Sequence, residues 1–500
     1  MLKQKFLVHF GSNIISRLLG ILAGILVARI AGPEVIGTIA YGTSYVGVWS
    51  FITGLFGSGH IKLISEGKDS GKCISVYSRI LFLSGLVYFL VVFVFFLTQK
   101  YILLVTFESS TQQAVIVVLL LVSVLEIFYQ LNSTTYNASM EVAKANAPIF
   151  LRSIFWQLGR IIIVLMGFKA LGLAVWNLAV TLFFIPVIYV FLKKHPKNGW
   201  DANLFKEYVK YAIPIFLIVV INSFIQFSDK LFLAHYTSTT ELGYFSAANS
   251  IGGLIMIASV SAGTIFFPLF SSYISKGEWV SVKQKIMQYN EFLSIFVFPF
   301  VCAIVIISEP ILINLLGRQY EPSIRPFMII ALATYISVVG MPYGNIITGA
   351  GRFYLNVLIN LLKLAVFLIS LTILLSPNFL NMGAVGLALN LLILNIFTNL
   401  CYLFFSKKLS GLSYFSLHNN LRYLLTILLA AVFYLKIYFS DNSQSFFWVF
   451  LGPVYFILVY CIMFTFRLVK RNNFKQFIDL LNLRKIFSYV SKELNDKQLK

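Results

Sequence analysis

Charged residues are scarce in this 500-residue chain. Asp, Glu, Lys and Arg together make up 11% of the residues, whereas ordinary globular domains carry roughly 25%. With 18 acidic and 39 basic side chains, a chain of this size cannot cover itself with a water-soluble surface. Apolar residues make up 59% of the chain, and its mean hydropathy is +0.86. The composition excludes soluble enzymes and secreted disulfide scaffolds and indicates a polytopic membrane protein.

Motifs for catalysis, nucleotides and metals are also lacking. The sequence has no GxxxxGK[ST] loop for ATP phosphates, no GxSxG and no HExxH, and its five histidines are scattered. We therefore expect no enzymatic activity, no catalytic residue, no cofactor and no metal site. The four cysteines have no CxxC spacing, and we expect free thiols packed in helices at Cys73, Cys302, Cys401 and Cys461.

What the chain does contain is a series of long apolar runs. A helix needs about 20 apolar residues to cross the hydrocarbon core. The connections are short, so no sizeable soluble domain is expected between the runs. The predicted fold class is an all-α polytopic membrane protein with about fourteen transmembrane helices, at approximately 12–30, 38–58, 79–98, 113–131, 149–167, 171–192, 211–234, 243–268, 289–308, 323–346, 355–376, 383–405, 420–439 and 446–468.

The basic residues predict the orientation, because Lys and Arg favour cytoplasmic loops. With the amino terminus inside, 29 of the 39 basic residues fall on the cytoplasmic side and 4 on the outer side. Both termini are therefore predicted to be cytoplasmic, and the net charge of +21 reflects topology rather than nucleic-acid binding. An alternative use for the basic end of the chain, residues 467–500, is contact with anionic lipid head groups.

Two stretches about 206 residues apart resemble each other. Residues 26–29 (LVAR) and 37–41 (GTIAY) lie around the first outer connection, and 232–235 (FLAH) and 243–247 (GYFSA) lie around the corresponding one six spans later. Repeats of six spans share one orientation and are related by a pseudo-twofold axis along the membrane normal. The predicted domains are two six-helix lobes, two additional spans and a basic tail, at 1–195, 196–410, 411–468 and 469–500.

Several charged side chains lie where hydrocarbon is expected. A charge at a helix centre costs on the order of 3 kcal/mol, so such residues usually face a cavity. Basic side chains outnumber acidic ones at this depth, which favours a phosphate or pyrophosphate ligand. The predicted binding residues, drawn from both lobes, are Arg17, Arg29, Arg160, Lys230 and Lys363, and the candidates for coupling to an ion are Glu126 and Asp229.

Structural interpretations of these charges stay open. Arg29 lies near a membrane interface, where a long side chain can extend its charge into water. Arg160 could pair with Glu126 on the adjacent span, and Asp229 could serve only to neutralise a neighbouring base. Such pairing does not account for every deep base, because the deep acids are fewer.

Seven short sequence patterns occur one after another along residues 1–410. These are ARIAGPEVIG (28–37), SDK (228–230), LGYFSAA (242–248), FP (267–268), GRQY (317–320), GAGR (349–352) and GAVG (383–386). In these patterns the sequence resembles the polysaccharide flippases, commonly called Wzx, of the multidrug/oligosaccharidyl-lipid/polysaccharide exporter superfamily.

The resemblance implies a two-lobed bundle of twelve core helices with extra carboxy-terminal spans. It also implies that the protein moves an undecaprenyl-pyrophosphate-linked oligosaccharide repeat unit from the cytoplasmic to the outer leaflet of a bacterial cytoplasmic membrane. This transport would serve O-antigen, capsule or exopolysaccharide synthesis, by alternating access driven by an ion gradient. Expected partners are the lipid-linked glycan, membrane lipids, a polysaccharide polymerase and a chain-length regulator, and no nucleic acid.

Other functions remain as alternatives. Flippases of lipid-linked peptidoglycan precursors also have fourteen spans and a basic cavity. Cation-coupled multidrug exporters typically use acidic cavity residues, which are sparse here. A membrane glycosyltransferase or polymerase would need a large outer loop with catalytic groups, and the sequence has only short outer connections. A scaffold without transport would give no reason for deep, uncompensated bases.

Overall fold

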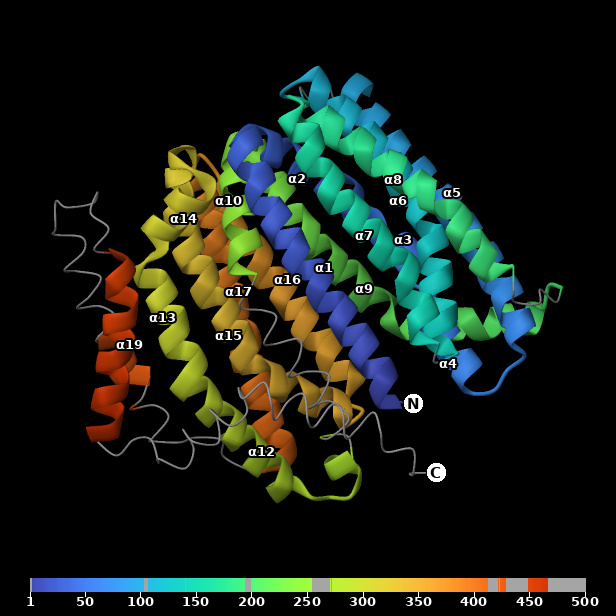
Figure 1. Ribbon diagram of the computed structural model, residues 1–500. Helices are drawn as coiled ribbons and strands as arrows, with labels where there is room; N and C mark the ends of the chain where they lie inside the picture. The colour runs from blue at the N-terminus through green and yellow to red at the C-terminus, as the bar shows by residue number, and fades with distance from the viewer. Residues whose placement is uncertain are drawn as a thin grey trace. The chain divides into compact units, whose positions relative to one another are not determined.

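The computed structural model is built from helices, and none of the residues it describes forms a strand (Figure 1). It describes residues 2–102, 107–139, 141–193, 199–253, 270, 272–411, 421, 423–428 and 448–465. The α-helices are α1 (Leu2–Ala31), α2 (Pro33–Gly47), α3 (Phe51–Gly54), α4 (Gly57–Ser65), α5 (Ser70–Leu97), α6 (Ser110–Ala138), α7 (Val142–Leu165), α8 (Ala170–Leu192), α9 (Ala202–Tyr236), α10 (Thr239–Gly252), α12 (Trp279–Phe292), α13 (Phe298–Ile306), α14 (Ser308–Leu316), α15 (Ile324–Gly349), α16 (Phe353–Leu375), α17 (Gly383–Ser410) and α19 (Trp448–Thr465).

Ten helical segments in the described part of the chain are long and apolar enough to cross a membrane. Two shorter apolar helices, Leu18–Ala31 and Val454–Met463, coincide with the first and the fourteenth predicted spans. The eighth predicted span, 243–268, begins in α10 and continues outside the described residues, where most of the thirteenth, 420–439, also lies. The predicted fold class, an all-α polytopic membrane protein, is confirmed.

The helices group into two compact units, each of which draws on two stretches of the chain. The first unit consists of Met1–Ser250 and Asn360–Leu387, and the second of Ile251–Ile359 and Ala388–Lys500. All of the predicted site residues therefore belong to the first unit. The two six-helix lobes and their pseudo-twofold axis stay predictions, and the basic tail lies outside the described residues.

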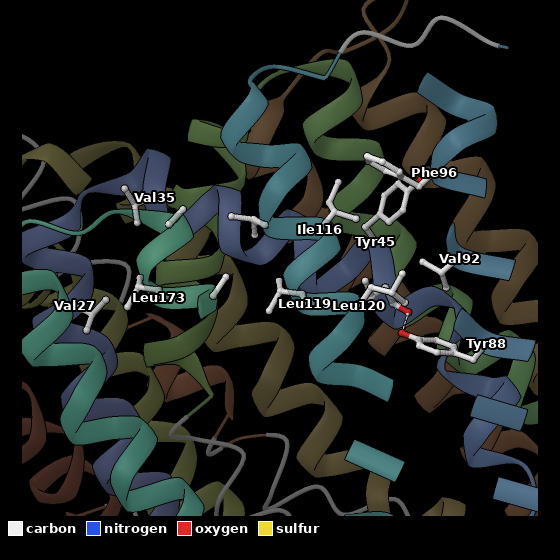
Figure 2. Packing of buried hydrophobic residues seen from close by; sticks show 14 of the residues in the cluster. Val27, Val35, Tyr45, Tyr88, Val92, Phe96, Ile116, Leu119, Leu120 and Leu173 are labelled. Carbon is white, nitrogen blue, oxygen red and sulfur yellow. Dashed lines mark hydrogen bonds between the residues drawn. The ribbon is translucent and has the colours of Figure 1, made fainter. Parts of the chain in front are cut away.

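An apolar cluster holds the first unit together where α1, α2, α5, α6 and α8 meet (Figure 2). Tyr88, Val92 and Phe96 recur every four residues on α5 and therefore share one helix face. The Tyr88 hydroxyl donates a hydrogen bond of 2.9 Å to the backbone carbonyl of Val46 on α2. Lipid tails are as apolar as these side chains, so the cluster stabilises the fold mainly through close packing.

Helices α2 and α10 cross at two glycines that are 206 residues apart. A Cβ on Gly37 would collide with the carbonyl oxygen of Thr239, and a Cβ on Gly243 would collide with the carbonyl oxygen of Pro33. Pro33 and Thr239 are separated by the same 206 residues, so the contact is reciprocal. Glycine is needed at both positions because the two backbones touch. Equivalent positions of the sequence repeat thus pack against each other.

Two carboxylates bind helix ends beside this crossing. Glu108 accepts a hydrogen bond of 2.8 Å from the backbone N–H of Thr239 and a second one from the Thr239 hydroxyl, at the start of α10. Glu241 accepts a hydrogen bond of 2.9 Å from the backbone N–H of Ala384, at the start of α17. Carboxylates are favourable at these positions because a helix amino terminus carries partial positive charge. Both acids therefore have structural partners.

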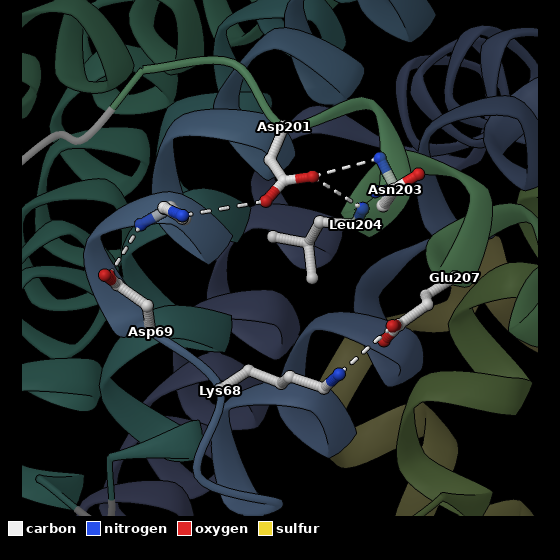
Figure 3. Close-up of polar contacts among 7 residues, drawn as sticks. Lys68, Asp69, Asp201, Asn203, Leu204 and Glu207 are labelled. Atoms are coloured by element: carbon white, nitrogen blue, oxygen red, sulfur yellow. Dashed lines mark hydrogen bonds and ion pairs between the residues drawn. The ribbon is translucent and has the colours of Figure 1, made fainter.

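A polar cluster joins the start of α5 to the start of α9 (Figure 3). Asp69 caps α5, and Asp201 caps α9 by accepting hydrogen bonds of 3.0 and 3.1 Å from the N–H groups of Asn203 and Leu204. Lys68 Nζ lies 3.1 Å from Glu207 Oε1, and this carboxylate raises the pKa of Lys68. The cluster connects the start of α9 to the α4–α5 turn.

The second unit has its own apolar core, formed by α13, α15 and α19. Its buried side chains include Val301, Val338 and Val459. Helix α17 packs on α15 through the amide of Asn395, which donates a hydrogen bond of 2.9 Å to the carbonyl oxygen of Ala333. None of the predicted site residues lies in this unit.

Candidate functional site

Arg160 of α7 lies against the backbone of α1. Its Nη2 donates a hydrogen bond of 2.5 Å to the carbonyl oxygen of Gly20, and a Cβ on Gly24 would lie 3.5 Å from the same nitrogen. A Cβ on Gly20 would lie 3.1 Å from Nε2 of Gln157, one turn before Arg160. The two glycines share a face of α1 because they are four residues apart. That face leaves room for the polar side chains of α7.

Three buried polar atoms on or against α7 have no hydrogen-bond partner within the described ranges. They are Nε of Arg160, Oε1 of Gln157 and Nε1 of Trp176, whose ring packs on Gly159. Buried polar groups in native proteins are nearly always paired, and an unsatisfied one costs about 1–3 kcal/mol. Arg160 also forms no ion pair with a described residue, although its Cζ lies 5.9 Å from the centre of the Trp156 ring. Among the described residues, no acidic side chain neutralises its charge.

Arg152 lies two turns earlier on α7 and has a different environment. Its Nη2 is 2.9 Å from Glu126 Oε1 and 3.3 Å from Asn177 Oδ1, and its Cζ is 4.7 Å from the centre of the Tyr129 ring. Glu126 therefore pairs with Arg152. The alternative considered from the sequence, a pair between Glu126 and Arg160, is not the one that the structure contains. The reason is position along the helix: Glu126 of α6 reaches the first half of α7, whereas Arg160 lies in the second half.

Asp229 and Lys230 of α9 pair with each other. The ammonium group of Lys230 is 3.2 Å from Asp229 Oδ1 and donates a second hydrogen bond, of 2.8 Å, to the carbonyl oxygen of Gln226. The side chain of Lys230 is 20% exposed and that of Asp229 is 18% exposed. The interpretation of Asp229 as partner of a neighbouring base therefore agrees with the structure. An anion at Lys230 would have to compete with this carboxylate.

Lys363 of α16 is half-buried, and it makes no hydrogen bond or ion pair with any residue that the structure describes. Its helix packs on α9 one turn later, where the rings of Phe367 and Phe224 are 6.2 Å apart at nearly a right angle. Like Arg160, Lys363 has no carboxylate partner among the residues that the structure describes. It is the second deep base of the first unit whose charge is uncompensated among the described residues.

The two remaining predicted bases lie on α1. Arg29 is exposed in the last turn of the helix, next to the tight turn at Gly32, whose φ of 84° favours glycine. Arg17 lies one turn before Gly20, and its side chain falls outside the described part of the chain. The convergence of all five bases on one chamber stays a prediction. The contact that the structure establishes is that of Arg160 with α1.

The sequence patterns missed Gln157, Arg152 and the glycine face of α1. A signal was present, because Arg152, Trp156 and Arg160 recur every four residues and place polar or amphipathic groups along one side of an apolar helix. Gly20 and Gly24 show the same spacing on α1. Together these two spacings would have indicated that the helices pack through this face.

Comparison with protein families identifies the chain. Residues 25–325, more than half of its length, match the family model described as polysaccharide biosynthesis protein. The chain belongs to this family. The matched region includes Arg160 and the Asp229–Lys230 pair and ends before Lys363. No curated protein sequence matches the chain.

Solved structures show that this polysaccharide biosynthesis protein shares a transporter fold. The lipid II flippase MurJ in an inward closed conformation matches with a TM-score of 0.72 at 16% identity, over 92% of this chain and 98% of MurJ. An inward-facing multidrug resistance transporter of the MATE family in the MOP superfamily matches with a TM-score of 0.66 at 13% identity, over 79% and 94% of the two chains. A MOP superfamily transporter from Pyrococcus furiosus, with a binding pocket described as reversed in polarity, matches at 0.52 and 13% identity, over 82% and 94%. At these identities the likeness establishes the fold.

Proposed function

We propose that this protein is a flippase that moves a polyprenyl-pyrophosphate-linked oligosaccharide repeat unit from the cytoplasmic to the outer leaflet of a bacterial cytoplasmic membrane. The head group carries a diphosphate and several sugars, and each unsatisfied polar group costs several kcal/mol in hydrocarbon. A protein site must therefore replace their hydration during transfer. In this proposal the polyprenyl tail stays in the lipid, and no bond is made or broken.

The observation that carries the proposal is the environment of Arg160. A guanidinium group has five N–H donors in a planar fork that suits phosphate oxygens. The described residues supply Arg160 with a carbonyl oxygen and an aromatic face but no carboxylate. A bound diphosphate would neutralise its charge and accept hydrogen bonds from the donors that remain. Lys363 would add a second positive charge from α16, with Arg17, Arg29 and Lys230 as further predicted contacts.

The family favours a glycan repeat unit as the cargo. Proteins of this family are described as polysaccharide biosynthesis proteins, and a flippase for such a pathway would deliver its cargo to a polymerase and a chain-length regulator. The second candidate is the lipid-linked peptidoglycan precursor, which the fold match to a lipid II flippase favours. Both candidates carry a diphosphate, so Arg160 would serve either one.

Directional transport requires a source of free energy. One elementary charge that crosses a membrane potential of 100 mV gains about 2.3 kcal/mol. Of the two candidates for ion coupling, Asp229 has the more enclosed side chain, 18% exposed against 51% for Glu126. We propose Asp229 as the coupling group, with Lys230 as the base that competes with the ion. Asp229→Asn should then make transport independent of the ion gradient.

Complementation of two bacterial strains tests the proposal. One strain lacks its polysaccharide flippase and the other its peptidoglycan-precursor flippase. We expect the wild-type gene to restore surface polysaccharide in the first strain only. Arg160→Gln and Lys363→Gln should strongly reduce this restoration at normal protein level. Lys169→Gln, at an exposed base outside the helices, is the matched control. Rescue of the second strain alone would identify the peptidoglycan precursor as the cargo, and full activity of both variants would refute the proposed phosphate site.

A further inference from the structure

A cavity of about 780 Å³ lies among α5, α6 and α8, on elements other than the α1–α7 contact that holds Arg160. Its walls are almost entirely apolar and include Phe82, Leu86, Phe89, Phe128, Ile188 and Tyr189. A volume of roughly 300–1,000 Å³ is typical of small-molecule sites. The cavity shares no lining residue with the proposed phosphate site, so any ligand it holds is a separate one.

The shape of the cavity follows from close contact between α5 and α6. A Cβ on Gly85 would collide with Cδ1 of Ile127, so the glycine lets the two helices touch. Both residues line the cavity. The cavity is open to the surface, because its lining residues Phe82 and Tyr189 are 68% and 64% exposed. These helices are long and apolar enough to cross the membrane. A cavity that opens from their apolar surface is accessible to a lipid chain.

The polar side chains of the cavity lining, Ser78, Tyr189 and Lys193, come from one end of it, near the start of α5 and the end of α8. Lys193, directly after α8, lines that end together with Ser78 of α5, and it forms no ion pair with a described residue. Next to Ser78, the guanidinium of Arg79 lies 5.6 Å from the centre of the Trp200 ring. The distribution of basic residues predicts that this end is cytoplasmic. Basic residues beside a Trp ring are typical of the part of a membrane protein that contacts lipid head groups.

We propose that this cavity binds an anionic phospholipid of the cytoplasmic leaflet. One acyl chain lies between α5, α6 and α8, and the phosphate and the anionic head group contact Lys193. Charge complementarity identifies the occupant: a zwitterionic lipid would bring its own cation to Lys193, whereas phosphatidylglycerol brings only negative charge. The basic pockets between transmembrane helices that bind acidic head groups on the cytoplasmic side follow the same principle.

Quenching of tryptophan fluorescence by brominated lipids tests this site. The reporter is Phe82→Trp at the cavity, and the control is Phe183→Trp on α8, which is equally exposed at 68% but does not line the cavity. Each full-length protein is reconstituted in phosphatidylethanolamine vesicles that contain brominated phosphatidylglycerol or brominated phosphatidylcholine, and the signal of the parent protein is subtracted. We expect roughly five-fold preference for phosphatidylglycerol at Phe82→Trp, the ratio typical of one basic contact, and none at Phe183→Trp.

Two further variants test whether Lys193 causes the preference for phosphatidylglycerol. In the Phe82→Trp background, Lys193→Gln should abolish the head-group preference, and Lys210→Gln, at another exposed base of the same predicted side, should leave it intact. Equal quenching by both lipids at Phe82→Trp, or a preference that survives Lys193→Gln, would overturn the proposal. Displacement of brominated phosphatidylglycerol by stoichiometric polyprenyl phosphate would also overturn it, because the cavity would then hold the carrier lipid.

Discussion

Arg152 and Arg160 lie eight residues apart on the same helix, yet their surroundings are opposite. Arg152 contacts a carboxylate, an amide oxygen and an aromatic face. Arg160 contacts a carbonyl oxygen and an aromatic face, and its buried Nε has no partner among the described residues. The two residues have the same chemistry and lie in the same predicted span, 149–167, with Arg152 near its cytoplasmic end and Arg160 deeper. What separates them is whether the neighbouring helix supplies an acid.

The difference shows how a deep base can be assigned to structure or to function. A base whose charge is already neutralised by its own fold stabilises the folded chain, and an anion gains little by approaching it. A base without a carboxylate leaves a charge that a ligand can neutralise. Substitution of Arg152 should therefore affect mainly stability, and substitution of Arg160 mainly transport.

The largest effect is expected for Arg160→Gln. Hydrogen bonds to charged groups contribute about 1.5–3 kcal/mol, so loss of one phosphate contact should lower the transport rate roughly 10- to 100-fold. The rate is measured as movement of a labelled polyprenyl-diphosphate oligosaccharide across proteoliposomes, per folded molecule. The transport rate of Arg160→Lys should lie between those of the wild type and Arg160→Gln, because Lys retains the charge but not the planar fork of the guanidinium group. An unchanged rate in Arg160→Gln would remove the distinction between the two arginines.

The second-largest effect is expected for substitutions that disturb helix packing and should change stability alone. They show what a loss of stability looks like when no functional residue is changed. Gly37→Ala or Gly243→Ala should lower stability by about 1–3 kcal/mol, because a Cβ at either position collides with a backbone carbonyl at the α2–α10 crossing. Thermal unfolding of the purified protein in detergent measures this change. Gly54→Ala is the matched control, since a Cβ there meets nothing within 4 Å. Equal melting temperatures for all three variants would show that α2 and α10 do not touch at these glycines.

Arg152→Gln should produce a smaller loss of stability than the glycine variants. The pair with Glu126 is partly exposed, with side chains 16% and 51% accessible, so its loss should cost about 1 kcal/mol of stability. The transport rate per folded molecule should stay near the wild-type value. Proteoliposome transport and thermal unfolding, measured on the same preparation, separate the two quantities. If the rate fell as far as in Arg160→Gln, Arg152 would belong to the functional site.

The smallest effect is expected at the exposed Lys68–Glu207 pair, which is an example of a neutralised base outside the membrane. The carboxylate raises the pKa of Lys68 above its ordinary value of 10.5. The pair therefore stabilises the folded state below that pH, and this stabilisation is lost as the pH rises through the folded-state pKa. The difference in melting temperature between wild type and Lys68→Gln should thus be small at pH 7 and vanish in strong alkali. A difference that grows with pH would contradict this assignment.

Much of the fold could be predicted from hydropathy and charge, because lipid requires each span to be one long apolar helix. The sequence similarity at a spacing of 206 residues could also be seen, and two glycines within it, Gly37 and Gly243, pack against each other. The partners of the deep charges could not be predicted, since apolar runs fix depth but not the direction in which a side chain points. Glu126 was therefore considered for Arg160, although it contacts Arg152.

Equilibrium binding of a polyprenyl diphosphate to the purified protein tests the central claim most directly. Wild type, Arg152→Gln and Arg160→Gln would be titrated under identical conditions, with inorganic pyrophosphate as competitor. The claim predicts that Arg152→Gln binds like wild type and that Arg160→Gln binds at least ten-fold more weakly, with both proteins folded. Equal binding by the two variants, or a loss confined to Arg152→Gln, would contradict it.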